Sequence, residues 1–432
     1  MGLPPSSLSQ SSAMLCFLLV LLVPLTVVGV AMVNSGLCRS RSAAHIVMAS
    51  LCVFGVAAIV YVSLGFSWQG IAGRPNHSLV IGAQTWSWIA AEPFFLRGLR
   101  LDLSAESLIV LLQIFSVGLV AVIPLSAGAD RWRLGASCVS AAFLAGCTYP
   151  LFAHWVWGGG WLSQLGTNRG LGRGFIDGGG ASTIQCVGGL SALSITLILG
   201  SRHGKFSRDG IPAAVPGHNA VLTLAGCLIA WVGWLGLNCA GAILLAGVDP
   251  SRVVLIAMNT TLAAIASGLT AAVVTRVRFA RPDASLVANG WMAGLVASSA
   301  APAFLKPAAA ILVGAVAGTL ALATIDLLEA RLAIDDPGGA VSVHGVAGIW
   351  GLLAISLLSD AGTTGQWLAQ VAGIATLLGF VLPLTYGLNW LLNKFYPQRV
   401  DEQGEEQGMD LYELGAGAYP EFVVHSEEFT QR

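Results

Sequence analysis

Eleven runs of mostly apolar residues follow one another along this chain, and ten of them are long enough to cross a bilayer. A transmembrane helix needs about 20 apolar residues, because the hydrocarbon core is about 30 Å thick. The pattern predicts an all-α integral membrane protein with eleven transmembrane helices, surrounded by the lipid bilayer. The short run at 286–300 has to lie against other helices. The expected spans are Met14–Val33, Ala43–Leu64, Ser107–Ala127, Leu134–Trp157, Ala181–Leu199, Ala220–Leu244, Val253–Val274, Leu286–Ala300, Ala308–Leu328, Val341–Leu357 and Trp367–Leu392.

Charged residues make up only 10% of the chain, whereas soluble domains carry about 25%. This composition excludes a soluble enzyme, a nucleic-acid binder and a disordered scaffold. No group of His, Cys, Asp and Glu has the spacing of a metal site, and the sequence contains no phosphate-binding GxxxxGK[ST] motif. We therefore expect no enzymatic activity, no cofactor and no metal. The eight cysteines lack CxxC spacing and are interpreted as small buried apolar residues.

The distribution of Lys and Arg predicts how the chain is oriented. The first twelve residues contain neither, unlike a secretory signal, so the first apolar run is expected to remain in the protein. With the N-terminus outside, the inner segments hold fourteen basic residues and the outer segments seven. Because inner loops are richer in Lys and Arg, we expect a multi-pass protein of the cell (inner) membrane with the N-terminus outside and the C-terminus cytosolic.

Two stretches of the chain repeat each other without a gap. Asp177-Gly-Gly-Gly-Ala opens the fifth span and Asp336-Pro-Gly-Gly-Ala opens the tenth, and each Asp precedes a polar residue, Gln185 or His344, by eight positions. Five spans separate the copies, so they run in opposite directions. The pattern predicts an inverted five-helix repeat, with copies at about 14–199 and 220–357, plus one extra C-terminal helix at 367–392. Inverted repeats are typical of transporters with a site at the membrane midplane.

The repeat also predicts a contact. Eight residues of helix rise about 12 Å, so side chains that enter a core of about 30 Å from opposite faces nearly meet at its centre. Gln185 and His344 are therefore expected to touch near the midplane. Ionisable groups inside spans usually mark a pathway. The alternatives are that the likeness of two Gly-rich helix starts is coincidental, or that the pair only joins helices by a hydrogen bond.

The last 33 residues are acidic, with nine carboxylates and one base. We interpret residues 1–393 as the transmembrane domain and 394–432 as a cytosolic tail. A solvated tail is the simpler interpretation. However, residues 400–420 contain Met409, Leu411 and Tyr412, and we expect this stretch to pack against the basic loops around Arg131, Arg202 and Arg276.

Several motifs occur along the chain: Ala153–Trp161, Asp177–Gly180, His218–Asn219, Gly233–Asn238, Asn289–Leu295, Asp335–Pro337, Val343–Gly348, Gly408–Gly415 and Ala418–Pro420. In these motifs the chain resembles the ammonium transporter family (Amt/Mep/Rh), nearer its Amt branch, from about Cys16 to Pro420. The resemblance implies eleven helices in a pseudo-twofold bundle, a pore in each subunit, a homotrimer and a regulatory tail that a PII-type regulator could contact.

The resemblance assigns roles to single residues. It implies that Trp157 lines an outer ammonium-recruiting site, where a cation–π contact is worth about 0.5–2 kcal/mol. Asp177 supports that site, and Trp234, in the motif Gly233–Asn238, is expected to belong to the pore. His344 corresponds to the second of two pore histidines.

The departures from the family pattern concern the pore. The first pore histidine is Gln185, which cannot take a proton. Counting along the motifs, two stacked phenylalanines of the outer gate become Ser116 and Leu237, although Phe115 is one residue away. Further departures are Gly241, Leu414 and Ala416. The sequence therefore predicts a degenerate twin-histidine pore.

The leading hypothesis is transport of ammonium or ammonia, with methylammonium as an analogue. Neutral ammonia is the favoured species, because a bare cation is costly to desolvate. One alternative is an ammonium sensor with little conduction, although such sensors usually carry a fused signalling domain, which we do not find in these residues. Another is a channel for a different small neutral molecule. A neighbouring gene for a PII-type regulator would favour transport, and one for a sensor kinase would favour sensing. Gln185→His would raise flux if the lost pair limits transport, and lower it if Gln185 is an adaptation.

Overall fold

The computed structural model describes residues 8–359 and 362–419. Within these ranges, ten helices are long and apolar enough to cross a membrane, and an eleventh apolar helix, α12, is shorter. The spans of the first half are α1 (Gln10–Leu22) with α2 (Pro24–Leu37), α3 (Ala43–Val60) with η2 (Tyr61–Gly65) and α4 (Phe66–Gln69), α5 (Ala105–Val122), α6 (Leu134–Phe143) with η5 (Leu144–Thr148) and α7 (Tyr149–Val156), and η6 (Ala181–Cys186) with α9 (Val187–Leu199).

The second half repeats this plan and adds one span. Its helices are α10 (Ala220–Leu244), α11 (Val253–Phe279), α12 (Ala284–Ser298), α13 (Pro307–Ala330), η8 (Val341–Val346) with α14 (Ala347–Leu358), and α15 (Thr364–Thr376) with η9 (Leu377–Val381) and α16 (Leu382–Phe395). Further short elements lie at the ends of spans or between them. They are η1 (Ser40–Ser42), η3 (Phe94–Leu96), η4 (Ile123–Leu125), α8 (Trp161–Arg169), η7 (Pro250–Arg252), α17 (Glu402–Gln407) and α18 (Met409–Leu414).

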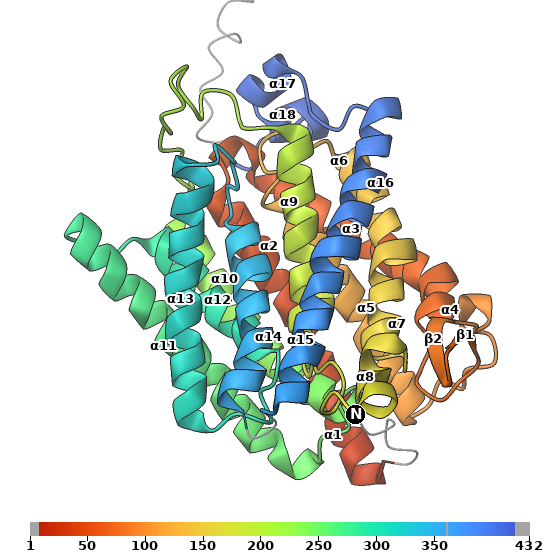
Figure 1. The fold of residues 1–432 in the computed structure, drawn as a ribbon. Helices are drawn as coiled ribbons and strands as arrows, with labels where there is room; N and C mark the ends of the chain where they lie inside the picture. Colours follow the sequence, from red (N-terminus) through yellow and green to blue (C-terminus); the bar gives the residue numbers. More distant parts are fainter. Residues whose placement is uncertain (1–7, 360–361, 420–432) are drawn as a thin grey trace, which may run out of the picture.

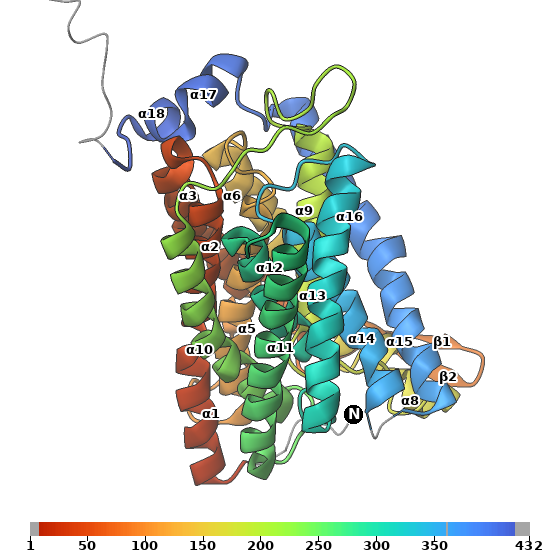
Figure 2. The same cartoon turned by 90° about the vertical axis from the view of Figure 1, so that its left-hand side faces the viewer.

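The spans form one bundle, with the start of α1 at one end and α17 and α18 at the other (Figures 1 and 2). An odd number of membrane crossings places the two described ends of the chain at opposite ends of the bundle. The short helix α12 packs against α10, α11, α13 and α14. The expectation that the run at 286–300 lies against other helices is therefore confirmed, and the all-α membrane fold with it.

The two copies of the repeated motif open the same kind of helix. Gly180 and Gly339, three residues after Asp177 and Asp336, have φ angles of 95° and 73°. A left-handed turn of this kind favours glycine. Each turn is followed by a π-helical segment, η6 or η8, in which the chain has one extra residue per turn.

The two segments also cross with reciprocal close contacts. A Cβ added at Gly189, four residues after Gln185, would lie 2.3 Å from the backbone nitrogen of Gly345. A Cβ added at Gly348, four residues after His344, would lie 2.6 Å from the sulfur of Cys186. In each copy, the glycine four residues after Gln185 or His344 contacts the residue that directly follows its counterpart in the other copy. This exchange is what a pseudo-twofold axis between the copies produces.

One element was not predicted. Residues 76–90, between the second and third spans, form an antiparallel hairpin of β1 (Asn76–Ile81) and β2 (Gln84–Ala90), which packs at the α1 end of the bundle against α7 and α8. The stretch has the Val, Ile, Thr and Trp residues and the central glycine of a hairpin. These signals are short and lie between two long apolar runs, whose length is the stronger pattern in this part of the chain.

The acidic tail is packed onto the end of the bundle opposite the start of α1. The Asp410 carboxylate accepts hydrogen bonds from the backbone nitrogens of Ala44 and His45, at 3.2 and 2.7 Å. Glu413 accepts from the backbone nitrogen of Leu134, at 2.8 Å, and contacts the ring of His45 at 2.7 Å. Both carboxylates therefore meet free N–H groups at the first turns of α3 and α6, where a negative charge is stabilised.

A second group of contacts fixes the start of the tail. The backbone nitrogen of Val400 donates to the carbonyl of Arg131, at 3.0 Å. Glu405 accepts from the backbone nitrogen of His203, at 2.6 Å, and from the guanidinium of Arg399, at 2.7 Å. The tail thus contacts the loops that follow α5 and α9.

The predicted packing of residues 400–420 is confirmed as far as residue 419. Pro420 and the rest of the tail to residue 432 lie outside the described residues, as do residues 1–7. The loops around Arg131 and Arg202 contact the tail as expected. Among the hydrogen bonds and ion pairs of the described chain, none joins the tail to the loop around Arg276, so that part of the prediction is wrong. The tail contacts the start of α3 instead, because the Asp410 carboxylate binds backbone N–H groups at that helix N-terminus.

Candidate functional site

Gln185 and His344 lie in contact at the crossing of η6 and η8. The Nδ1 atom of His344 is 2.7 Å from Oε1 of Gln185, and the two residues are 5% and 0% exposed. The expected contact is confirmed. Since an amide oxygen only accepts, Nδ1 carries the proton and Nε2 is an acceptor. The Nε2 amide group of Gln185 is buried and has no hydrogen-bond partner among the described residues. The pair therefore offers one free donor and one free acceptor.

Asp177 organises the start of η6. Its carboxylate accepts hydrogen bonds of 2.8–3.0 Å from the backbone nitrogens of Gly180, Ala181, Ser182 and Thr183. It also accepts from the hydroxyls of Ser182 and Thr183, at 2.5 and 2.9 Å. The side chain is fully buried. A carboxylate with this many donors is stable without a basic partner, and it fixes the backbone that carries Gln185.

Trp157 lies next to this turn and beside a small cavity. Its indole Nε1 donates to the backbone carbonyl of Asp177, at 2.8 Å. The cavity has a volume of about 10 Å³, the space that one water-sized molecule needs. Its lining consists of Gln69, Gly70, Ile71, Ile109, Trp157, Leu244 and Leu245. An ammonium ion is about as large as water, so the indole is placed to contact one.

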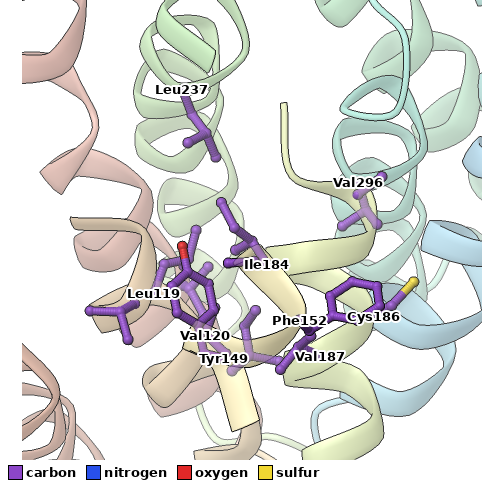
Figure 3. Packing of buried hydrophobic residues seen from close by; sticks show 14 of the residues in the cluster. Leu119, Val120, Tyr149, Phe152, Ile184, Cys186, Val187, Leu237 and Val296 are labelled. Carbon is purple, nitrogen blue, oxygen red and sulfur yellow. The ribbon is translucent and has the colours of Figure 1, made fainter. Parts of the chain in front are cut away.

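The remaining predicted site residues lie in the apolar core. Leu237 is 1% exposed and belongs to the buried cluster drawn in Figure 3. The hydroxyl of Ser116 is buried and donates to the carbonyl of Leu112, at 2.8 Å. The helix α5 is uninterrupted, which leaves Phe115 half-buried at the edge of the core. Trp234 is fully buried, and its Nε1 donates to the Ser299 hydroxyl at 2.8 Å.

The amino-acid sequence matches the model of the Ammonium Transporter Family over residues 13–419. The chain belongs to the ammonium transporter family. It is 33% identical to ammonium transporter Amt2 of Archaeoglobus fulgidus, over 96% of this chain and 89% of that protein. It is 30% identical to an ammonium transporter of Bacillus subtilis, over 93% of this chain and 97% of that protein.

Solved structures agree with this family assignment. A protein described as a Sensor Amt Protein superimposes with a TM-score of 0.83 at 26% identity, over 93% of this chain and 98% of that chain. Mep2 of Candida albicans superimposes with a TM-score of 0.78 at 23% identity, over 96% and 91%, which supports the fold alone.

Several residues near the candidate site of this ammonium transporter were not singled out from the sequence. Ser182 and Thr183 complete the shell around Asp177, and their only signal was their place five and six residues after it. Gln69 lines the cavity of Trp157, and its carbonyl lies 2.7 Å from Nδ1 of His154. Contacts of this kind join distant parts of the chain, and a single sequence does not reveal them.

Proposed function

We propose that this protein carries ammonium across the membrane through a pathway that passes Trp157, the level of Ser116 and Leu237, and the Gln185–His344 pair. The observation that supports this most is the pair itself. Two polar side chains meet inside an apolar bundle with one donor and one acceptor left unused. Buried polar groups normally find partners, and a passing substrate can supply them.

The free groups fit neutral ammonia. Its lone pair accepts from the Gln185 amide, and its N–H groups donate to Nε2 of His344. A bare cation at this point would be costly, because the surrounding side chains are apolar and desolvation of a charge is expensive. The cation is therefore held near Trp157, and neutral ammonia is the species that continues past the pair.

The Gln185 pore differs from a twin-histidine pore in its proton chemistry. The Oε1 atom of Gln185 accepts a hydrogen bond from the Nδ1–H group of His344 and holds the ring in one tautomer, as hydrogen-bond partners of a histidine commonly do. No proton can be shared between the two side chains, because an amide does not titrate. On this proposal the degenerate pair positions ammonia and does not relay a proton, so Gln185→His lowers uptake.

The test is uptake of labelled methylammonium by proteoliposomes that contain the full chain. Saturable uptake above that of empty vesicles supports transport. Absence of uptake from correctly folded protein contradicts it. Current recorded on adding ammonium shows whether charge crosses with the substrate.

A sensor is the second candidate, because a structure described as a Sensor Amt Protein superimposes on this chain at 26% identity. Binding of ammonium without uptake would favour it. Transport with binding at the same concentrations would favour the first proposal.

We also propose that the protein is a homotrimer in the cell (inner) membrane, with the N-terminus outside. The count of fourteen inner against seven outer basic residues supports this orientation. Residues 1–393 then form the transmembrane domain, and 394–432 a cytosolic tail that a PII-type regulator could reach. Native mass spectrometry tests the trimer, and cysteine labelling from either side tests the orientation.

A further inference from the structure

A pocket with a volume of about 410 Å³ is lined in part by Arg202 and Lys205. His203, in the same loop, contacts the docked tail, so the pocket lies at the tail end of the bundle. It lies between the start of η8, the start of α12, the end of α13 and the loop that follows α9. Five carboxylates and two bases line it, together with Ser342 and Asn289. The charged lining residues are Arg202, Lys205, Asp283, Asp326, Glu329, Asp335 and Asp336.

The two bases of the pocket are already paired. Arg202 donates to Asp335 at 2.9 and 3.0 Å, and Lys205 donates to Glu329 at 2.5 Å. Burial by itself would raise the pKa of Asp335, but the neighbouring Arg131 and Arg202 hold it below its usual value.

Asp326 has its own partner, Arg278, at 2.6 Å. Asp283 and Asp336 make no ion pair with any described residue, and each accepts backbone N–H groups at the start of a helix. The pocket therefore carries an excess of negative charge.

Asp336 is less completely satisfied than its counterpart in the other repeat. It accepts from the backbone nitrogens of Ala340 and Val341, at 3.1 and 2.8 Å, and from no hydroxyl. Burial raises its pKa to about 6, so the carboxylate is ionised at neutral pH. It can accept further hydrogen bonds from a ligand, because a carboxylate has about four acceptor positions.

Ser342 supplies the second observation. It occupies the offset at which Thr183 donates to Asp177, yet its own hydroxyl is fully buried and has no partner among the described residues. The Asn289 amide lines the same pocket and lies next to Gly339, where an added Cβ would be 2.9 Å from Nδ2. A buried hydroxyl without a partner is costly, and here it faces a pocket.

We infer that this pocket is a second ammonium-binding site, in which the Asp336 carboxylate, the Ser342 hydroxyl and the Asn289 carbonyl accept the N–H groups of the cation. The inference rests on the proposed transport of ammonium and extends it to the tail side of the pathway. Ser342 precedes His344 by two residues, about 3 Å of helix. An ammonium ion bound in the pocket thus lies on the tail side of the Gln185–His344 pair.

The test is calorimetric titration of the full chain in detergent with ammonium chloride at constant ionic strength. Two binding events are expected, one at Trp157 and one at the pocket. Ser342→Ala should weaken one event by about tenfold, since a hydrogen bond to a charged group is worth about 1.4 kcal/mol or more, and leave the other unchanged. This substitution removes an unpartnered hydroxyl, so the protein should still fold.

Ser356→Ala is the matched control. Ser356 lies on the same span, and its hydroxyl also has no partner among the described residues, but it does not line the pocket. Identical titrations of the two variants would overturn the inference. Tighter binding of potassium or sodium than of ammonium at this event would overturn the assignment to ammonium.

Uptake by proteoliposomes from the same preparation separates the inference from the proposed function. A single ammonium event with intact uptake would overturn the second site alone. Two events without uptake would overturn transport and leave the site supported.

Discussion

Asp177 and Asp336 stand at the same offset before two π-helical segments, yet the Asp177 carboxylate accepts six hydrogen bonds and the Asp336 carboxylate accepts two. Near Asp177 the hydroxyls of Ser182 and Thr183 donate to the carboxylate and complete the set of donors around it. Near Asp336 the corresponding residues are Val341 and Ser342, and the shell is open to a pocket. The backbone of the repeat is thus kept in both copies, while the side chains make one turn structural and leave the other able to bind a ligand.

Removing either carboxylate should change the free energy of unfolding more than any other substitution at these two turns. Asp177→Ala should lower the free energy of unfolding by about 3–5 kcal/mol, because several buried donors lose their acceptor. Asp336→Ala should cost about 1–3 kcal/mol, because only two backbone donors are affected. Thermal unfolding of the purified variants in detergent measures both. Equal losses would contradict the difference between the copies.

Substitution of the glycines where the two repeated segments cross should give the next largest change in the free energy of unfolding. Gly189→Ala should lower the free energy of unfolding by about 1–3 kcal/mol, because its Cβ would lie 2.3 Å from the Gly345 nitrogen and the helices would have to move apart. Gly345→Ala is the control, since the nearest atom to its Cβ is 3.8 Å away. The same thermal unfolding assay compares the two. A Gly189→Ala protein as stable as Gly345→Ala would show that the crossing is looser than described.

The raised pKa of Asp336 predicts a pH effect on the tail-side pocket. Ammonium keeps its charge between pH 7 and 5, whereas Asp336, with a pKa of about 6, becomes protonated as the pH falls. Affinity at the pocket should therefore decrease by about tenfold at pH 5. The other charged groups around Asp336 are Arg131, Arg202, Lys205, Asp283, Asp326, Glu329 and Asp335. Titration at both pH values, with Asp336→Asn as the control, measures the change, and a decrease that persists in that variant would assign it to another group.

The hydroxyls of Thr183 and Ser342 should give the smallest difference in the free energy of unfolding. Thr183→Val removes a donor to Asp177 and should lower the free energy of unfolding by about 1–2 kcal/mol. Ser342→Ala, measured without ammonium, should leave it unchanged or raise it slightly, because the hydroxyl that is removed has no partner. Chemical or thermal unfolding in ammonium-free buffer tests both. A loss for Ser342→Ala similar to that for Thr183→Val would mean that Ser342 has a structural partner.

The sequence predicted those parts of the structure that depend on periodicity and symmetry. Span length predicted the bundle, and the matching offsets of Gln185 and His344 predicted their contact. The partners of Asp410 and Glu413 were predicted only in part. Those carboxylates bind backbone N–H groups at the starts of α3 and α6, whereas the expected basic loops contact Val400 and Glu405. The position of a free helix N-terminus is a property of the folded chain.

The polar shell of each Asp was less accessible to sequence reasoning. Thr183 and Ser342 occupy matching places in the repeat, yet one donates to a carboxylate and the other does not. The difference follows from local backbone geometry and from the pocket beside η8, which many distant segments build together. A pattern of residue types along one chain does not specify such a cavity.

On this proposal, substrate passes along the Gln185–His344 pair and contacts the Gln185 amide and Nε2 of His344. The most direct measurement is methylammonium uptake by proteoliposomes that contain the unsubstituted protein or Gln185→Leu, which keeps the size of the side chain but removes its donor and its acceptor. We expect the variant to fold and its uptake to fall at least tenfold, because His344 loses its hydrogen bond and ammonia loses its donor. Uptake by Gln185→Leu equal to that of the unsubstituted protein would show that the pair does not lie on the pathway, and would contradict the account.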